Sequence, residues 1–214
     1  MFKRVLLLFT LVFLVSGLVA GIPVHISMAK LTKIEKKYGP KAKKRVLLWD
    51  KMLIKAKRKK TLEKLKLVND FFNKVKYKRD NLHWKKKDYW ASPFEFLGTG
   101  AGDCEDYAIA KYFALRQLGI PDSKLRITYV KLSRKGTKYD EAHMVLNYYH
   151  KPTQTPIVLD NVNKRLTLAT KRKDLKPIYS FNAVGLWKAQ QKGKTQKSMG
   201  SNRLKNWKSM MERI

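Results

Sequence analysis

Apolar residues recur at three- and four-residue spacings over residues 30–76, a pattern typical of amphipathic helices. One series covers residues 47–54 and a second covers 62–75, and the residues 57–60 between them are all basic. The pattern therefore predicts two helices in the N-terminal region, with a break near 57–60.

Residues 77–102 are rich in aromatic side chains that follow neither a helical nor a strand period. Pro93 and the glycines at positions 98, 100 and 102 interrupt this segment, and both residue types favour turns. We expect loop and turn here.

A helix is predicted from Cys104 to Leu118, because apolar residues occupy almost every side of it and Gly119 and Pro121 follow as stop signals. A helix that is apolar all round is buried in the core of its domain. Burial would hold the first residue of this helix, Cys104, in a fixed position.

Three strands are expected after this helix, over residues 125–132, 142–149 and 156–162, where apolar and polar residues alternate or apolar runs end at turns. A polar hairpin loop at 134–141 and a turn at 150–155 connect them, and short connections join antiparallel neighbours. The order of elements predicts an α+β fold, in which the buried helix that carries the cysteine packs on an antiparallel sheet beside a helical N-terminal region.

Residues 1–29 are typical of an export signal. A short basic start precedes an uncharged run from Val5 to Val19, and small residues that suit cleavage end at Ala29, with an earlier site at Ala20. The alternative is an uncleaved anchor, since the run is near the lower length limit of a membrane span. Either way, the rest of the chain is expected to lie outside the cytoplasm.

The remaining chain divides into one domain and a tail. Residues 30–187 have the length and composition of a single globular domain. Residues 188–214 are polar, basic and weakly periodic, so we expect a peripheral C-terminal tail that could hold a helix.

The net charge of +32 bears on the partners of the chain. Residues 30–66 alone hold 16 lysines and arginines against three acidic residues. A solvated surface explains such a run; steering toward an acidic substrate and loose contact with an anionic membrane surface are the functional alternatives. Nucleic acid is disfavoured, because the chain carries an export signal and no nucleic-acid-binding motif.

Cys104 is the only cysteine, so an exported chain cannot form an internal disulfide and keeps a free thiol. At a helix start, unsatisfied N–H groups and the helix dipole favour the thiolate. Three carboxylates, Asp103, Glu105 and Asp106, adjoin the thiol and could cap the helix or raise the thiol pKa. A bound cation would cancel that repulsion, and oxygen ligands suit calcium, although no EF-hand spacing is present.

His143 in the second strand and Asp160 at the end of the third are the candidates for a base and for the group that orients it. If those strands pair, their register could bring both side chains to one face. A core histidine and a strand-end turn residue are the alternatives. A cysteine on a helix, followed by histidine and aspartate on adjacent strands, is the order of papain-like and transglutaminase-like folds.

Several separate segments resemble the bacterial transglutaminase-like cysteine proteinases, in the same order as in that family. They are Asp88–Pro93, Gly102–Tyr112, Leu125–Val130, Ala142–Leu146, Val158–Asn161, Arg172–Leu175 and Tyr179–Asn182. The similarity extends from about Lys66 to Trp187.

The resemblance implies a calcium-dependent periplasmic protease that cuts a large surface adhesin near its N-terminus and so releases cells from a biofilm. It implies Cys104 as nucleophile, His143 as base and Asp160 as orienter. Asp103 and Glu105 would be calcium ligands. An inner-membrane receptor that senses cyclic di-GMP typically sequesters such enzymes.

The expected reaction is attack of the Cys104 thiolate on a peptide carbonyl, followed by hydrolysis of the thioester. The Cys104 backbone N–H is one expected oxyanion donor; Trp84 and Trp90 are candidates for the second, although core packing explains both. Two other functions stay open. One is a transglutaminase or other acyltransferase with the same triad, and the other is a non-enzymatic basic binding module.

Overall fold

The computed structural model describes residues 25–134, 136, 139–183, 186–188 and 205–214. The apolar run of the expected export signal and most of the expected tail lie outside these residues. Among the described residues, no helix combines the length and the apolar character needed to cross a membrane.

Three helices form the N-terminal region: α1 (Met28–Tyr38), α2 (Pro40–Ala56) and α3 (Thr61–Phe72). The predicted break at 57–60 is confirmed. A second break, which the pattern did not predict, falls at Gly39, where φ is 84° and a proline begins α2. Glycine adopts this positive φ without strain, and proline suits the first helical position because it needs no N–H partner there.

Two short helices, α4 (Asp80–His83) and α5 (Pro93–Thr99), lie in the segment expected to be loop and turn, so that expectation was wrong for them. α5 forms because Ser92 and Glu95 cap its start reciprocally. The Ser92 hydroxyl accepts from the Glu95 N–H at 3.3 Å, and the Glu95 carboxylate accepts from the Ser92 N–H at 2.8 Å. Gly100 ends α5 in the left-handed conformation.

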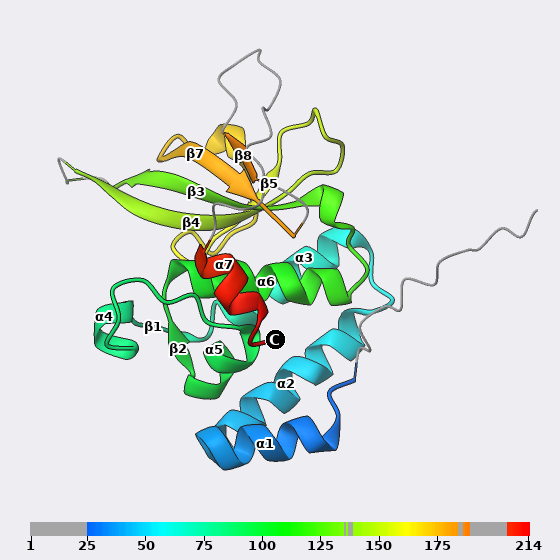
Figure 1. Cartoon of the computed structure of the whole chain (residues 1–214). Helices are drawn as coiled ribbons and strands as arrows, with labels where there is room; N and C mark the ends of the chain where they lie inside the picture. Colours follow the sequence, from blue (N-terminus) through cyan, green and yellow to red (C-terminus); the bar gives the residue numbers. More distant parts are fainter. Residues whose placement is uncertain (1–24, 135, 137–138, 184–185, 189–204) are drawn as a thin grey trace, which may run out of the picture.

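The helix predicted at Cys104 is α6 (Cys104–Gln117), which lies between the sheet and the N-terminal helices (Figure 1). It follows β2 (Ala101–Gly102), which pairs in parallel with β1 (Lys76–Tyr77). Most side chains of α6 are buried, including Ile109 and Tyr112. This burial fixes the helix and, with it, the place of Cys104 at its start.

The main sheet has six strands in the order β6-β5-β4-β3-β7-β8, and all neighbours are antiparallel. Three strands match the prediction: β3 (Leu125–Ser133), β4 (Asp140–Tyr148) and β5 (Ile157–Leu159). Three others were not predicted: β6 (Thr167–Leu168), β7 (Leu175–Phe181) and β8 (Leu186–Lys188). Single turns of 3-10 helix precede β3 and β7: η1 (Asp122–Lys124) and η2 (Ala169–Lys171).

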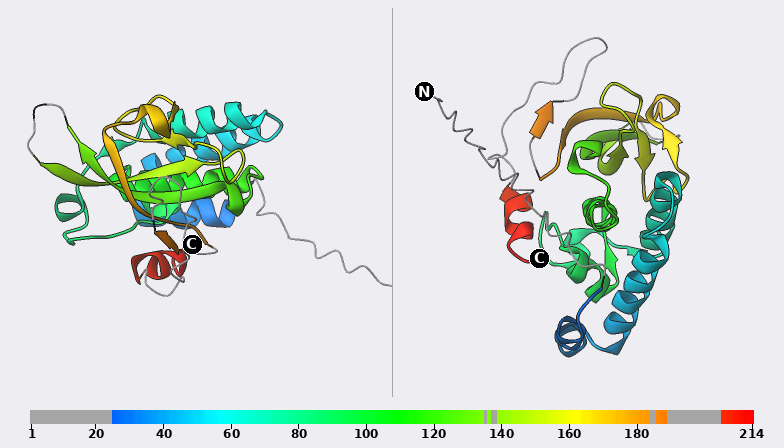
Figure 2. Two further views of the ribbon diagram at one scale, coloured as in Figure 1. Left: turned by 90° about the horizontal axis from the view of Figure 1, so that it is seen from above. Right: turned by 90° about the vertical axis from the view of Figure 1, so that its right-hand side faces the viewer.

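Strand alternation gives the sheet two apolar faces of unequal size. Met144 and Leu146 belong to the main core, which includes α6 and the N-terminal helices. Val130, Val145 and Val158 form a small second cluster on the other face. Figure 2 shows the N-terminal helices and α6 gathered on one side of the sheet. The predicted α+β fold, with the cysteine helix buried against an antiparallel sheet, is confirmed.

The C-terminal residues 205–214 are part of the folded domain. α7 (Lys205–Met211) confirms the expected helix, but Trp207 and Met210 are buried, so this end of the chain is not a peripheral tail. Trp207 stacks on Phe113 of α6 with ring centroids 5.8 Å apart. The contact places α7 against the helix that carries Cys104 (Figure 1).

Candidate active site

The two strands that carry the candidate base and its partner lie side by side. β4 and β5 pair with Leu146 opposite Leu159, and this register sets His143 and Asp160 diagonally across the two strands on one face. His143 Nε2 lies 2.8 Å from Asp160 Oδ1, and both side chains are buried. The structure brings these two residues together as the order of the strands predicted.

Asp160 is held by further contacts. Its Oδ1 atom accepts from the Val162 N–H at 3.0 Å, its Oδ2 atom accepts from Arg172 Nη2 at 2.8 Å, and its main-chain oxygen accepts from Asn73 Nδ2 at 2.9 Å. Although burial opposes ionisation, His143 and Arg172 hold the pKa of Asp160 well below its usual range. Sequence reasoning assigned Arg172 no role; only its place in a segment that resembles the family pointed to it.

Cys104, the first residue of α6, is partly exposed. Its Sγ atom donates to Glu105 Oε2 at 2.9 Å, and within the described residues no hydrogen bond joins it to the His143 ring. Burial raises the pKa of the thiol well above its ordinary value and the charge of Glu105 adds to the rise, while the Met144 N–H acts in the opposite direction. Burial and, after it, the neighbouring carboxylate therefore outweigh the effect of the helix start, which alone would favour the thiolate.

Five carboxylates crowd beside the thiol, in three overlapping groups whose ligand atoms lie within 4.8 Å of one another. The groups are Asp80, Asp103 and Asp106; Asp103, Cys104 and Glu105; and Asp80, Asp88 and Glu105. Burial raises the pKa of Asp103 to about 9 and that of Glu105 to about 7, and the charge of Glu105 adds to the shift of Asp103. Sequence reasoning missed Asp80, because it lies on α4, well before the cysteine motif.

The carboxylates differ in their hydrogen bonds. Asp106 caps the start of α6, since its carboxylate accepts from the N–H groups of Ala91 at 2.8 Å and Asp103 at 3.3 Å. Asp80 Oδ1 and Asp103 Oδ1 are buried without a hydrogen-bond partner in the described part of the chain. Crowded carboxylate oxygens that lack donors suit a hard cation such as calcium. Asp103 and Glu105, with Asp80 beside them, fit a calcium site, whereas the capping alternative holds for Asp106.

The family described as bacterial transglutaminase-like cysteine proteinase BTLCP matches residues 44–179. The chain belongs to this family. EGTA-treated LapG of Legionella pneumophila is 39% identical, with a TM-score of 0.76 over 88% of this chain and 97% of LapG. Calcium-bound LapG of the same organism is 40% identical, with a TM-score of 0.73 over 88% and 99%. A search of curated proteins finds no match.

Membership in a family of cysteine proteinases makes Cys104 the candidate nucleophile. This transglutaminase-like proteinase is a cysteine protease with a LapG-like fold, and Cys104 is the only thiol in its sequence. The backbone N–H of Met144, next to His143 on β4, is close enough to this thiol to lower its pKa through a hydrogen bond. The start of α6 and the middle of β4 therefore meet at the sulfur.

The two tryptophans considered as oxyanion donors differ in this proteinase. Trp90 Nε1 donates to Asp88 Oδ1 at 2.9 Å, and its ring stacks on Phe181 with centroids 5.4 Å apart, so core packing accounts for it. Trp84 packs against Tyr89 at 4.5 Å, and its Nε1 atom is buried without a partner among the described residues. Of the two, Trp84 is the one with an indole N–H still to be paired.

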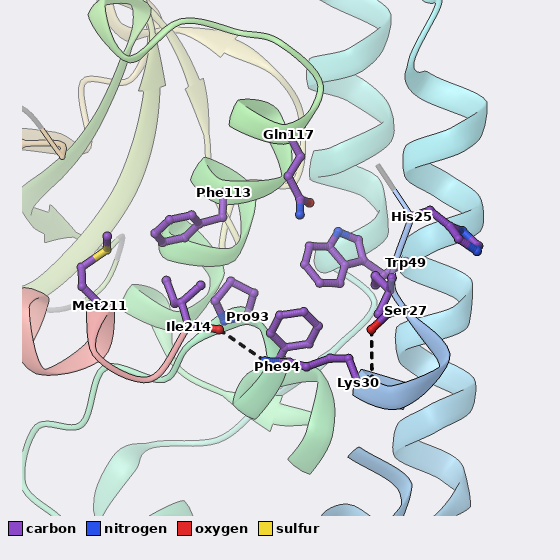
Figure 3. A pocket seen from close by; sticks show the side chains of 11 residues that line it. His25, Ser27, Lys30, Trp49, Pro93, Phe94, Phe113, Gln117, Met211 and Ile214 are labelled. Carbon is purple, nitrogen blue, oxygen red and sulfur yellow. Dashed lines mark hydrogen bonds between the residues drawn. The ribbon is translucent and has the colours of Figure 1, made fainter. Parts of the chain in front are cut away.

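A cavity of about 430 Å³ lies between the N-terminal segment, α2, α5, α6 and the C-terminus (Figure 3). Trp49, Phe94 and Phe113 line it, and Lys30 Nζ donates to the main-chain oxygen of Ile214 at 3.3 Å beside it. Its lining includes none of the candidate catalytic or calcium-binding residues. The candidate active site of this proteinase is the junction of α6, β4 and β5 instead.

Proposed function

We propose that this proteinase is a calcium-dependent periplasmic cysteine endopeptidase that cleaves a large, acidic surface adhesin near its N-terminus. Cleavage would release the adhesin and promote dispersal of a biofilm. One observation carries the proposal: the only thiol starts a buried helix beside unpaired carboxylates, next to a bonded His143–Asp160 pair. Family membership and the likeness to LapG support the protease, and the sequence resemblance supports the adhesin.

In the proposed reaction Cys104 is the nucleophile, His143 the base and Asp160 the orienter. Asp160 Oδ1 accepts a hydrogen bond from His143 Nε2, which leaves Nδ1 to take the thiol proton. The thiolate attacks the peptide carbonyl carbon, and the Cys104 backbone N–H stabilises the negative oxygen. His143 then returns the proton to the leaving amine, and water hydrolyses the thioester.

Asp103 and Glu105 would hold calcium, whose positive charge would offset the repulsion among these crowded carboxylates. Glu105 now accepts the thiol hydrogen bond, and its charge raises the pKa of Cys104. A calcium ion held by Glu105 would offset that charge and leave the thiol available to His143. The calcium-bound and EGTA-treated forms of LapG support a calcium site in this family.

The partners and the location belong to the same proposal. An N-terminal export signal would bring the enzyme to the periplasm, where an inner-membrane receptor that senses cyclic di-GMP would sequester it. The net charge of +32 and the many lysines of α1, α2 and α3 support an acidic adhesin as substrate. The same basic surface would allow loose contact with an anionic membrane.

Incubation with a purified fragment of an acidic surface adhesin tests the proposal. Cleavage is expected in calcium, is lost in excess chelator and returns when calcium is added back. Cys104→Ala and His143→Gln abolish cleavage, whereas His150→Gln, an exposed histidine at a turn, serves as the matched control and leaves it unchanged. Full cleavage in excess chelator would contradict the calcium requirement.

The adhesin-fragment assay and a biofilm assay of the Cys104→Ala variant separate the two other functions. Incorporation of a labelled primary amine without cleavage of the fragment would identify an acyltransferase that uses the same thioester. A biofilm effect that survives Cys104→Ala would identify a non-enzymatic binding module. Either result overturns the protease proposal.

A further inference from the structure

Lys111 is fully buried in α6, about two helical turns after Cys104. Its Nζ atom lies 5.8 Å from the centre of the Tyr107 ring, and the Tyr107 hydroxyl donates to the main-chain oxygen of Val75, just after α3, at 2.5 Å. In the described chain this Nζ atom has no hydrogen-bond partner. Burial of an ammonium group without an acceptor is unfavourable, so its surroundings call for an explanation.

Asn69 of α3 and Asn73, the residue that follows α3, meet the turn after β5. Asn73 Nδ2 donates to the main-chain oxygen of Asp160 at 2.9 Å, and Asn69 Nδ2 donates to that of Lys164 at 2.7 Å. These two bonds tie the turn 160–164 to α3. Their own carbonyl atoms, Asn69 Oδ1 and Asn73 Oδ1, are buried without a donor among the described residues.

Lys111 belongs to the same junction of α3, α6 and the turn. Burial lowers the pKa of Lys111 to about 7, although the charges of Asp160 and Asp70 favour the ammonium form. The Tyr107 ring beside Lys111 leads to the same place, because its hydroxyl bonds to the main-chain oxygen of Val75, two residues after Asn73, and Asp70 lies between the two asparagines in the chain. The junction therefore holds one buried donor and two buried acceptors, which is the combination that an ordered water joins.

We propose that Lys111 is a positioning residue, which acts with Asn69 and Asn73 through a bound water to fix the turn after β5 and hold Asp160 against His143. The inference rests on the proposed role of Asp160 in catalysis. Arg172 holds the carboxylate of Asp160 through Oδ2, whereas the Lys111 cluster holds its main chain through Asn73. Together these contacts keep both parts of Asp160 in place.

The charge of Lys111 also acts on Asp160. The titratable groups around the junction are Asp160, Arg172, Asp174, Asp70, Tyr107, Cys104 and Glu105. Of the groups on α6, Lys111 is the basic one whose charge reaches Asp160. The ammonium group therefore adds an electrostatic attraction to the hydrogen bonds that hold Asp160.

The test compares Lys111→Met and Lys111→Gln with the unaltered protein in calcium-containing buffer. NMR of the histidine rings is expected to show broadened His143 ring signals in both variants, because Asp160 no longer holds the ring in one place, with His150 as an internal reference. Carbamidomethylation of Cys104 by iodoacetamide is expected to slow roughly tenfold in Lys111→Met and less in Lys111→Gln, which keeps a donor. Neither readout needs a protein substrate, so failure here is distinct from failure of the adhesin proposal.

Lys64→Met is the matched control, because Lys64 Nζ donates to the main-chain oxygen of Leu118 at 2.8 Å, between the same two helices but at the far end of α6. It is expected to lower stability without broadening the His143 ring signals. Unchanged His143 ring signals and an unchanged alkylation rate in both Lys111 variants overturn the proposal. If neither variant folds, Asn73→Ala carries the test: it frees the Asp160 main chain and slows alkylation, and an unchanged rate refutes the positioning role.

Discussion

At the residue scale, the carboxylate of Asp160 serves two partners at once. Oδ1 is bonded to the His143 ring, while Oδ2 is bonded to Arg172, which also pairs with Asp174 at 2.7 Å. The planar guanidinium can bind both carboxylates because its donors lie in a fixed fork. Arg172 therefore sets the plane of the Asp160 carboxylate and, through it, the direction of the His143 ring.

Arg172→Met is expected to destabilise the fold by about 3–5 kcal/mol at pH 7, because it leaves a buried carboxylate short of its charged partner. The pKa of Asp160 is depressed in the folded state, so this contribution is present above about pH 4 and is lost as the pH falls below it. Urea unfolding at pH 7 and pH 3 should show the difference between variant and parent narrowing at low pH. Lys176→Met, which breaks an exposed pair with Asp140, is the control and should cost no more than about 1 kcal/mol. Equal effects of both substitutions would contradict the role of Arg172.

The acidic cluster gives a second prediction at this scale, on pH and calcium. The pKa of Asp103 is raised to about 9 and that of Glu105 to about 7. These two groups therefore contribute most to the stability of the calcium-free fold below about pH 4, where both are protonated. It declines as the pH rises through 7 toward 9, because the crowded carboxylates must ionise. Calcium is expected to raise the thermal midpoint most at pH 8.5 and least at pH 5.5.

Thermal unfolding in chelator and in calcium at these pH values measures the effect. Asp103→Asn should reduce both the decline in chelator and the gain from calcium, since it removes one charge from the cluster. A calcium-induced gain that is as large at pH 5.5 as at pH 8.5 would show that these carboxylates are not where calcium and protons compete.

At the scale of elements, the start of α6 depends on a close approach between Gly102 and Asp106. A Cβ atom on Gly102 would lie 2.2 Å from Asp106 Oδ2 and 2.7 Å from the Phe96 ring. The Asp106 carboxylate cannot retreat, because it accepts from the N–H groups of Ala91 and Asp103. The glycine before the cysteine motif is therefore required by packing around the helix cap.

Gly102→Ala is expected to destabilise the protein by about 1–3 kcal/mol and to weaken calcium binding, because the displaced cap moves Asp103. Urea unfolding and calorimetric calcium titration measure the two effects. Gly119→Ala is the control: it has φ of 84° and nothing within 4 Å of its added Cβ, so it strains the backbone far from the cap. Gly119→Ala should lower stability and leave calcium affinity unchanged. A calcium affinity in Gly102→Ala equal to that of the unaltered protein would refute the link between the cap and the calcium site.

The elements that the sequence predicted are those with a strong local pattern. α6 is apolar on all sides and β3 alternates, so both were found nearly to the residue. β6 and β8 have two and three residues, and β7 contains Pro177, so their existence depends on pairing with strands already in place. α5 was missed because its glycine-rich sequence outweighed the Ser92–Glu95 capping box that starts it.

The residues of the site also divide into those that the sequence predicted and those that it did not. Cys104, His143 and Asp160 could be proposed because each residue type is chemically distinctive and their order matches known folds. Asp80 and Lys111 could not, because each is brought to the site by tertiary packing alone and looks ordinary in its own segment. The bond from the Cys104 thiol to Glu105 was also beyond sequence reasoning, since it depends on which way two adjacent side chains turn.

At the scale of the whole molecule, the two ends of the described chain share one surface. Lys30 on α1 donates to the main-chain oxygen of Ile214, and Arg213 donates to that of Trp90 at 2.6 Å. The cavity of Figure 3 is bounded by residues from both ends. The segment that leads into α1 is therefore part of the folded domain.

This packing favours the earlier of the two cleavage sites expected in the export signal. Ile26 is buried and its N–H donates to Asp50 Oδ1 at 3.1 Å, and the Ser27 hydroxyl accepts from the Lys30 N–H at 3.3 Å to cap α1. Cleavage after Ala29 would remove both residues, whereas cleavage after Ala20 would keep them. We therefore expect a mature chain that begins at Gly21.

N-terminal sequencing of the exported protein measures the site directly. A chain that begins at Lys30 should be less stable than one that begins at Gly21 by about 2–4 kcal/mol, the sum of a lost helix cap and a lost buried isoleucine. A chain that begins at His25 is the control and should match the longer one, because it keeps Ile26 and Ser27 and the ion pair of His25 with Asp50. A mature N-terminus at Lys30, or equal stability of all three chains, would show that the segment before α1 does not belong to the fold.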